Sequence, residues 1–387
     1  MMRNAFTAAR LASRNRAVRS KFLSTQVEQA PAEVTFDIAP FATHKIDAPE
    51  PRAVSNADEL HGYFRSMYRM RRMEMESDAL YTRQMVRGFC HLYNGQEAVA
   101  VGIEAATTFD DCLITAYRNH CQQLARGDTV ESILSELTGR ANGCSKGKGG
   151  SMHLYKPDNN YYGGNGIVGA QGPLGAGLAF AQKYNNTGKV SITMFGDGAA
   201  NQGQIFEVIN MSALWNLPTV FVCENNRYGM GTSTKRSAKS EDFYTRGDYI
   251  PGIRIDGMDV LCVREGMKFA ADYARENGPI YVEMDTYRYK GHSISDQGLG
   301  YRSIDEINIV KASRDPIDRV KARLIEHGWA TPKELKAEEK QIRKEVDAAV
   351  KVAETAPHPP NTDLFTDVYV GDPGFIRGTL ATNGNSS

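Results

Sequence analysis

An acidic side chain and an amide side chain stand at the ends of two successive apolar runs. Gly196-Asp197-Gly198 closes the first run and Asn225-Asn226 closes the second, and the second asparagine comes 29 positions after the aspartate. Because the carboxyl ends of parallel strands meet at one edge of a sheet, Asp197 and Asn226 are expected to lie close together. Their oxygens, with the backbone carbonyl of Tyr228, are the ligands that Mg²⁺ prefers beside phosphate groups. The two motifs therefore predict a magnesium-diphosphate site.

The segment between the two motifs has the pattern of a helix that connects parallel strands. Residues 190–195 and 220–223 are short apolar runs, and apolar residues recur at helical spacing over residues 204–215. A unit of this length joins neighbouring parallel strands by a right-handed crossover. Gly198 permits a close approach to an anion, and the amides that follow Ala199 would face it. Gly-Asp-Gly alone is a common turn, so the prediction depends on the asparagines of the second strand.

Strand and helix candidates alternate along the middle of the chain. Strands are expected at 113–116 and 280–284, and helices at 176–184 and 260–275, besides the unit already described. Such alternation predicts an α/β fold with a mainly parallel sheet flanked by helices.

Two further helices are expected outside this alternation. One begins at Ser55, with Asp58 in a capping-box position and an apolar face formed by Leu60, Phe64, Met67 and Tyr68. The other begins at Thr331, with its apolar stripe at Leu335, Ile342, Val346 and Val350.

We divide the chain into four segments by composition and pattern. They are a transit peptide at 1–27, a proline-containing extended arm at 28–54, the α/β domain at 55–330, and a C-terminal helix and tail at 331–387.

The distribution of charge indicates a targeting segment. The chain has 46 basic and 46 acidic residues, yet its first 27 residues contain six basic residues and no acid. An Arg-rich, Ser/Ala-rich and acid-free start is typical of a mitochondrial transit peptide, so we expect the mature protein in the mitochondrial matrix. The alternative is a basic tail without a targeting role. No apolar run approaches the ~18 residues that a membrane span requires, and the balanced charge gives no reason to expect nucleic-acid binding.

Cysteines and a glycine-lysine loop give weaker signals. The six cysteines have no paired spacing, which favours reduced thiols over a disulfide framework or a zinc site. The run from Lys146 to His153 is glycine-rich and contains two lysines, so it has the composition of a phosphate-cradling loop. Its spacing departs from the P-loop, and nucleotide triphosphate binding is not expected.

Longer motifs carry a resemblance to a known family. The run Gly-Asp-Gly-Ala-Ala-Asn-Gln-Gly-Gln-Ile-Phe-Glu and the downstream run Cys-Glu-Asn-Asn-Arg-Tyr-Gly-Met-Gly-Thr closely resemble alpha subunits of the thiamine diphosphate-dependent 2-oxo acid dehydrogenases. The resemblance extends from about residue 64 to about residue 316. It implies a thiamin diphosphate-binding fold of the pyrophosphate type, with an extra N-terminal helix and C-terminal helices. It also implies thiamine diphosphate and Mg²⁺ as cofactors.

The resemblance also implies roles for particular residues. It makes His292 and His91 the catalytic candidates, because histidine moves protons near neutral pH. Met230 would support the bent shape of the cofactor. The implied cofactor-binding residues are Tyr117, Arg118, Gly166, Val168, Asp197, Gly198, Ala199, Asn226, Tyr228 and His292.

Two loops point to a substrate. Tyr-Arg-Tyr-Lys-Gly-His-Ser-Ile-Ser-Asp and Phe-Cys-His-Leu-Tyr are more similar to the subunits that act on pyruvate than to those that act on branched-chain 2-oxo acids. The implied reaction is oxidative decarboxylation of pyruvate with reductive acetylation of a lipoyl group. The branched-chain enzyme is the alternative, and a second alternative is a scaffold that has lost its metal. Intact Asp197, Asn226 and Arg118 argue against the scaffold.

The resemblance further implies partners and regulation. In the family, a glutamate that activates the aminopyrimidine ring comes from a domain with no counterpart here, so a beta subunit and an α2β2 assembly are expected. The other expected partners are a dihydrolipoyl acetyltransferase core with lipoyl domains, a kinase and a phosphatase. Ser293 and Ser233 match phosphorylation positions of the family, whereas Gly300 replaces a third serine.

Overall fold

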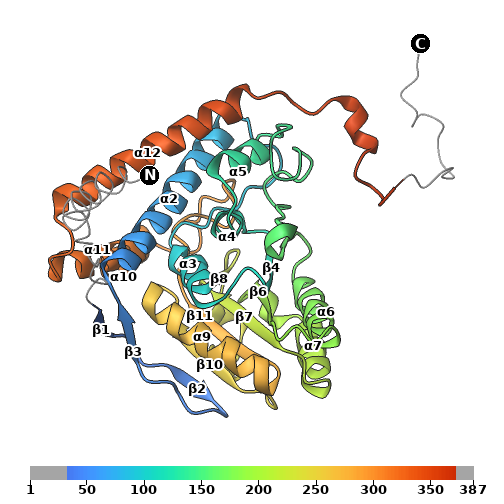
Figure 1. Cartoon of the computed structure of the whole chain (residues 1–387), viewed down its shortest axis with the longest axis vertical. Helices are drawn as coiled ribbons and strands as arrows, with labels where there is room; N and C mark the ends of the chain where they lie inside the picture. The colour runs from blue at the N-terminus through green and yellow to red at the C-terminus, as the bar shows by residue number, and fades with distance from the viewer. Residues whose placement is uncertain (1–32, 372–387) are drawn as a thin grey trace, which may run out of the picture.

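A seven-stranded sheet forms the centre of the molecule (Figure 1). The computed structural model describes residues 33–371, so the expected transit peptide lies outside the described residues. Five of the six strand pairings are parallel, and only the edge strand β2 runs antiparallel to its neighbour. The strands, in spatial order, are β2 (Ala42–His44), β10 (Gly252–Asp256), β11 (Ile280–Asp285), β7 (Thr219–Asn225), β6 (Ser191–Gly196), β4 (Cys112–Ala116) and β5 (Tyr161–Asn165). The mainly parallel α/β fold predicted from the sequence is confirmed.

Helices cover both faces of this sheet, which explains why its central strands are apolar almost throughout. On one face α6 (Gln171–Tyr184) and α7 (Gly203–Leu214) pack on β6, through buried residues such as Ala179, Ile205 and Phe195. On the other face lie α9 (Val260–Asn277) and α3 (Glu97–Ala106), whose buried residues join those of α2 (Ala57–Thr82) in a second cluster. The remaining α-helices of residues 33–371 are α4 (His120–Ala125), α5 (Val130–Leu137), α8 (Thr234–Ser237), α10 (Ile304–Arg314), α11 (Pro316–Glu326) and α12 (Pro332–Thr355).

The described part of the expected N-terminal arm consists of short strands. β1 (Val34–Asp37) pairs antiparallel with β3 (Arg52–Ser55), and β2 joins the edge of the large sheet. The predicted start of the following helix was wrong by one residue. Ser55 ends β3, and Asn56 is the N-cap, because its side chain accepts a hydrogen bond from the Glu59 amide at 3.0 Å. The predicted apolar face of this helix is buried throughout.

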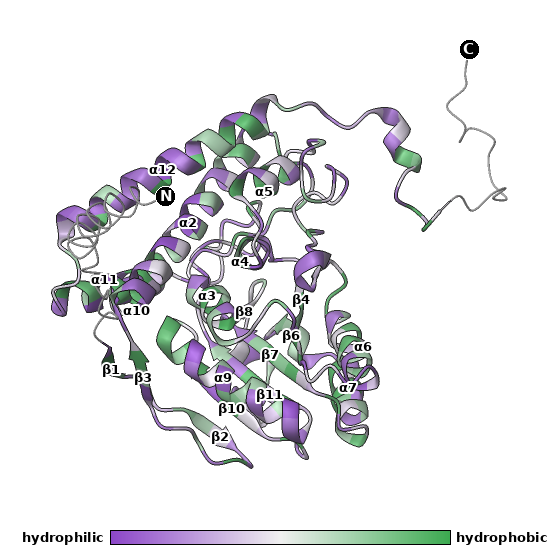
Figure 2. Ribbon diagram, in the orientation of Figure 1, coloured by the Kyte–Doolittle hydropathy of each residue, from purple (hydrophilic) through white to green (hydrophobic). Residues whose placement is uncertain are grey.

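The C-terminal helix α12 begins as predicted. Thr331 and Glu334 form a capping box, and the predicted stripe is buried against α2 and α5. Figure 2 shows the resulting alternation of hydrophilic and hydrophobic residues along α12. The helices α10 and α11 lie between the sheet and α12 in the chain, and the sequence analysis did not locate them individually.

The glycine-lysine loop binds an internal anion. The buried carboxylate of Glu136 accepts hydrogen bonds from four backbone amides, those of Ser145, Gly147, Gly149 and Gly150, at 2.7–3.1 Å. These amides are therefore occupied by a carboxylate of the same chain, and a phosphate-binding role for the loop is not supported.

Within the described residues, all six cysteines are free thiols, as the sequence predicted. The same part of the chain contains no group of three or more His, Cys, Asp or Glu placed to hold a metal ion. None of its helices is long and apolar enough to cross a membrane.

Candidate active site

A cavity of about 250 Å³ opens at the carboxyl ends of β4, β6 and β7, where the sheet topology predicted a site. Ten of the residues singled out from the sequence line it, and they come from segments far apart in the chain. These residues are Tyr117, Arg118, Val168, Asp197, Gly198, Ala199, Asn226, Tyr228, Met230 and His292.

Asp197 and Asn226 present buried oxygens that lack a hydrogen-bond partner. β6 and β7 pair in parallel, so the residues that follow them leave the sheet side by side. Asp197 Oδ2 and Asn226 Oδ1 are both buried, and within the described residues neither receives a hydrogen bond. Burial raises the pKa of Asp197 to about 6. Two unsatisfied oxygens in one cavity are costly without a ligand, and they fit a hard divalent cation such as Mg²⁺.

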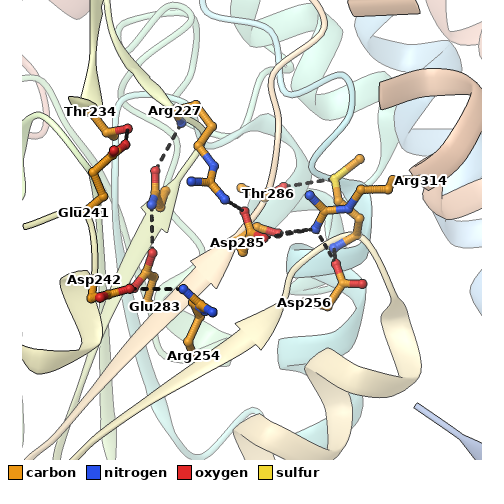
Figure 3. Close-up of polar contacts among 12 residues, drawn as sticks. Arg227, Thr234, Glu241, Asp242, Arg254, Asp256, Glu283, Asp285, Thr286 and Arg314 are labelled. Atoms are coloured by element: carbon orange, nitrogen blue, oxygen red, sulfur yellow. Dashed lines mark hydrogen bonds and ion pairs between the residues drawn. The ribbon is translucent and has the colours of Figure 1, made fainter. Parts of the chain in front are cut away.

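The turn that carries Asn226 is held by the side chains of its neighbours in the chain. Figure 3 shows one of them, Arg227, beside Asp285. Asn225 donates to Glu283 at 2.7 Å, and the guanidinium of Arg227 binds Asp285 at 2.5 Å. Arg227 has φ 76°, a strained conformation for a residue other than glycine. These contacts hold the backbone of the turn and so the position of Asn226.

A close backbone approach completes the anion-binding side of the cavity. Tyr228 and Gly229 form β8 (Tyr228–Gly229), which pairs with β9 (Thr232–Ser233). A Cβ atom on Gly229 would lie 3.2 Å from Gly198 Cα, so a larger residue there would press on the loop after Asp197. Ala199 opens a short 3-10 turn, and α7 begins only at Gly203. The amides nearest the cavity therefore belong to this turn and not to the helix itself.

Arg118 joins the two segments that carry the candidate histidines. Its guanidinium donates to the carbonyl of Leu92 at 2.7 Å and to the carbonyl of His292 at 2.9 Å. The ring of Tyr117 packs against both histidines, with its centroid 4.4 Å from that of His91 and 5.8 Å from that of His292. His91 does not line the cavity, but its ring centroid is 5.2 Å from that of His292.

Both histidines are neutral at pH 7. Burial and, second, the charge of Arg118 lower the pKa of His292 to about 4. The same two causes lower the pKa of His91 far below its ordinary value. Each neutral imidazole therefore has a ring nitrogen that can accept a hydrogen bond.

The loop after β11 is held by side chains that the sequence analysis missed. Asp296 accepts hydrogen bonds from the His292 amide and the Tyr301 hydroxyl, both at 2.7 Å. Arg288 is fully buried beside this loop, and its Nε and Nη1 atoms find no partner among the described residues. Burial and, next, Arg118 lower the pKa of Arg288 to about 10. Ser293 is itself buried, and its hydroxyl lies 2.8 Å from that of Ser295.

Two other predicted residues differ in position. Val168 lines the cavity, and its carbonyl accepts a hydrogen bond from the side-chain amide of Gln204 at 3.3 Å. Gly166 is not among the lining residues, and its neighbour is the ring of His153.

Glu224 is a further lining residue that the sequence analysis did not assign. It is buried, accepts a hydrogen bond from the Tyr93 hydroxyl, and has its pKa raised to about 7 by burial. Its place in Cys-Glu-Asn-Asn, at the polar end of an apolar strand, was the available signal.

Comparison with known proteins agrees with this geometry. Residues 65–362 match the family model described as "Dehydrogenase E1 component". The chain belongs to this family. It is 58% identical over 331 residues to the mitochondrial pyruvate dehydrogenase E1 component subunit alpha of Pisum sativum, covering 86% of this chain and 83% of that protein. It is 55% identical over 351 residues to subunit alpha-1 of Arabidopsis thaliana, covering 91% and 90%. Against the somatic form of Bos taurus the identity is 52% over 349 residues, covering 89% of each.

Proposed function

We propose that this chain is the alpha subunit of a mitochondrial pyruvate dehydrogenase E1 component, which uses thiamine diphosphate to decarboxylate pyruvate and acetylate a lipoyl group. The observation that carries the proposal is the pair of unsatisfied oxygens, Asp197 Oδ2 and Asn226 Oδ1, in one cavity with Arg118 and His292. The names of the relatives support pyruvate over a branched-chain 2-oxo acid and support a mitochondrial location.

The lining residues suggest how the cofactor would be held. Asp197, Asn226 and the Tyr228 carbonyl would bind Mg²⁺, and the amides of Gly198 and Ala199 would meet the diphosphate. The guanidinium of Arg118 offers parallel donors to phosphate oxygens, next to Tyr117. Gly166 and Val168 would offer backbone groups to the aminopyrimidine ring, and Met230 would support the bent cofactor.

Bound thiamine diphosphate supplies the carbon nucleophile that attacks the 2-oxo acid, and the protein supplies orientation and proton transfer. His292 lies at the wall of the cavity with a neutral imidazole, so it can accept a proton or a hydrogen bond from the reacting groups. His91 packs against the rings of Tyr117 and His292, and it would act near the substrate.

The cavity also favours a second subunit. At about 250 Å³ it is smaller than the ~300–1,000 Å³ of pockets that enclose a ligand. α7 begins beside this cavity. The other end of α7 and the end of α6 expose apolar side chains, which we call the apolar patch: Phe180, Tyr184, Met211, Leu214 and Trp215. An exposed apolar patch on helices that flank an incomplete site is typical of a subunit interface. We infer that the beta subunit covers this patch and completes the site in an α2β2 assembly, which in turn would meet the lipoyl domains of an acetyltransferase core.

Leu214→Asp should prevent this assembly without unfolding the chain. Leu214 is 75% exposed, so the charge costs little in the free subunit but is buried unpaired in the complex. Co-purification with a tagged beta subunit should fall sharply, while thermal unfolding of the free chain stays unchanged. Ile309→Asp is the matched control, since Ile309 is 67% exposed on α10 and lies outside the patch. Equal loss of assembly in both variants would contradict the assignment of the patch.

Ser293 and Ser233 are the proposed phosphorylation sites, acted on by a kinase and a phosphatase. A phosphate on Ser293 would place about −2 charge beside His292 and displace the Ser295 hydroxyl. Ser233 is the N-cap of α8, and it lies on the β8–β9 hairpin that follows the turn carrying Asn226. Because Ser293 is buried, its loop would have to open before a kinase reached it.

The proposed function is tested by reconstitution. The chain assembled with its beta subunit should decarboxylate pyruvate in a reaction that depends on thiamine diphosphate and Mg²⁺, and much faster than it does branched-chain 2-oxo acids. The chain alone should be inactive. Full activity without a second polypeptide would overturn the assembly, and a preference for branched-chain acids would overturn the substrate.

A further inference from the structure

Gln96 lies directly behind the proposed metal ligand Asn226. It is fully buried at the N-terminus of α3, and its Oε1 accepts a hydrogen bond from Asn226 Nδ2 at 3.1 Å. We propose that Gln96 is a positioning residue that sets the orientation of the Asn226 amide, so that Oδ1 faces the cation. This inference rests on the proposed function, because it concerns how the same site binds its metal ion.

An asparagine side chain has two ends of nearly equal shape and opposite polarity. Only the oxygen can bind a cation, and the NH₂ group in its place would repel one. Gln96 Oε1 can accept only from the nitrogen end, so its hydrogen bond leaves Oδ1 of Asn226 directed into the cavity. Burial makes the choice strong, because no bulk water can replace the partner of a buried amide group.

No other contact in the described residues orients this side chain. Asn225 contacts Glu283, and Arg227 contacts Asp285 (Figure 3). These two contacts fix the backbone of the turn but leave the Asn226 amide free to rotate. The hydrogen bond to Gln96 is the one that the Asn226 side chain makes within residues 33–371.

Gln96 is itself held in place by its backbone. Its amide donates to the carbonyl of Tyr93 at 3.0 Å, and its carbonyl accepts from the Val99 amide at 3.0 Å. Gly95, immediately before it, has φ 102°, and a Cβ there would lie 2.3 Å from the Tyr287 carbonyl. The backbone of Gln96 therefore lies at a fixed point between the start of α3 and the end of β11.

Two substitutions of Gln96 distinguish the effect of its hydrogen-bond acceptor from the effect of its size. Gln96→Met has a similar length and no comparable acceptor. Gln96→Glu has acceptors only, and it loses no hydrogen bond because Gln96 Nε2 has no partner among the described residues. Losing an outer contact of a metal ligand commonly weakens metal binding by about 10–100-fold. We expect that loss in the methionine variant, and affinity close to the unsubstituted protein in the glutamate variant.

The experiment measures Mn²⁺ binding by electron paramagnetic resonance, at fixed thiamine diphosphate, on the chain assembled with its beta subunit. Thermal unfolding is recorded in parallel. Gln123→Met is the matched control, because it removes a buried glutamine that donates to Asp128 at 2.6 Å and to the Tyr155 carbonyl at 3.0 Å outside the cavity. It should lower stability and leave Mn²⁺ affinity unchanged.

The outcomes separate this inference from the function on which it rests. Weak binding in Gln96→Met with retention in Gln96→Glu and Gln123→Met supports the positioning role. Unchanged affinity in Gln96→Met, equal loss in the methionine and glutamate variants, or equal loss in the control overturns it. If the unsubstituted assembly fails to bind Mn²⁺ with thiamine diphosphate, the proposed function itself fails.

Discussion

Asp197→Asn should nearly abolish cofactor-dependent decarboxylation and at the same time stabilise the cofactor-free protein. The substitution keeps the shape of the side chain and removes the only carboxylate among the proposed metal ligands. Loss of one such preorganised electrostatic contact commonly costs on the order of 10²–10³-fold in rate. Binding of Mg²⁺ with thiamine diphosphate should weaken accordingly, as isothermal titration calorimetry of the assembled enzyme would show.

The gain in stability follows from the pKa of Asp197. Burial raises this pKa from 3.8 to about 6, so the folded state prefers the protonated acid. The stabilisation of the folded state by the protonated Asp197 carboxyl is fully present below pH 3.8, and it is lost as the pH rises through about 6. At pH 7 the ionised carboxylate then destabilises the cofactor-free protein by roughly 3 kcal/mol. Denaturant unfolding between pH 4 and pH 7 should show this decline, and the decline should be smaller in Asp197→Asn, in which Glu224, with its pKa raised to about 7, still contributes.

Two results would contradict this prediction. Unchanged activity of Asp197→Asn would show that the carboxylate does not bind the cation. A cofactor-free variant that is less stable than the unsubstituted protein at pH 7 would show that the carboxylate is already satisfied in the apo site.

Arg118→Met should lower activity by about 100-fold and make both histidines easier to protonate. The guanidinium holds the Leu92 and His292 carbonyls together, and it would also contact the diphosphate. Its charge is the second cause, after burial, of the low pKa of His292. Removing the charge should therefore raise the pKa of His292 from about 4 toward its ordinary value of 6.5. Proton NMR of the two imidazoles over pH 4–8 would measure the change.

Arg118→Lys separates charge from geometry. Lysine keeps the positive charge but lacks the planar pair of donors that bridges two carbonyls. The histidine pKa values should stay low in this variant, while activity should still fall. If lysine restored full activity, the bridging geometry of Arg118 would have no role.

The sequence predicted the parts of the site that depend on strand order. Asp197 and Asn226 converge as expected, because each follows an apolar strand and a helix of the right length joins the two strands. Sequence preferences were not sufficient to choose between two neighbouring residues that could both cap the helix. Ser55 and Asn56 are both good N-caps, and only the pairing of Ser55 in β3 shows that Asn56 begins the helix.

Residues that act through long-range contacts were not predictable from the sequence. Gln96 is 130 positions from Asn226, the asparagine that it orients. Glu136 holds the glycine-lysine loop, and it lies up to 14 positions before the amides that it binds. Arg288 had the appearance of a surface arginine, and burial without a full set of partners became visible only in the fold. Such contacts depend on packing between segments, which periodicity does not encode.

The proposed function depends on Asp197 and Asn226 together binding the cation that holds the diphosphate. The most direct test is a crystal structure of the assembled enzyme with thiamine diphosphate and Mn²⁺, with the ion located by its anomalous scattering. The account predicts one ion bound by Asp197 Oδ2, Asn226 Oδ1 and the Tyr228 carbonyl, in contact with both phosphates. An ion bound elsewhere, or a diphosphate bound while these two side chains point away from it, would contradict the account.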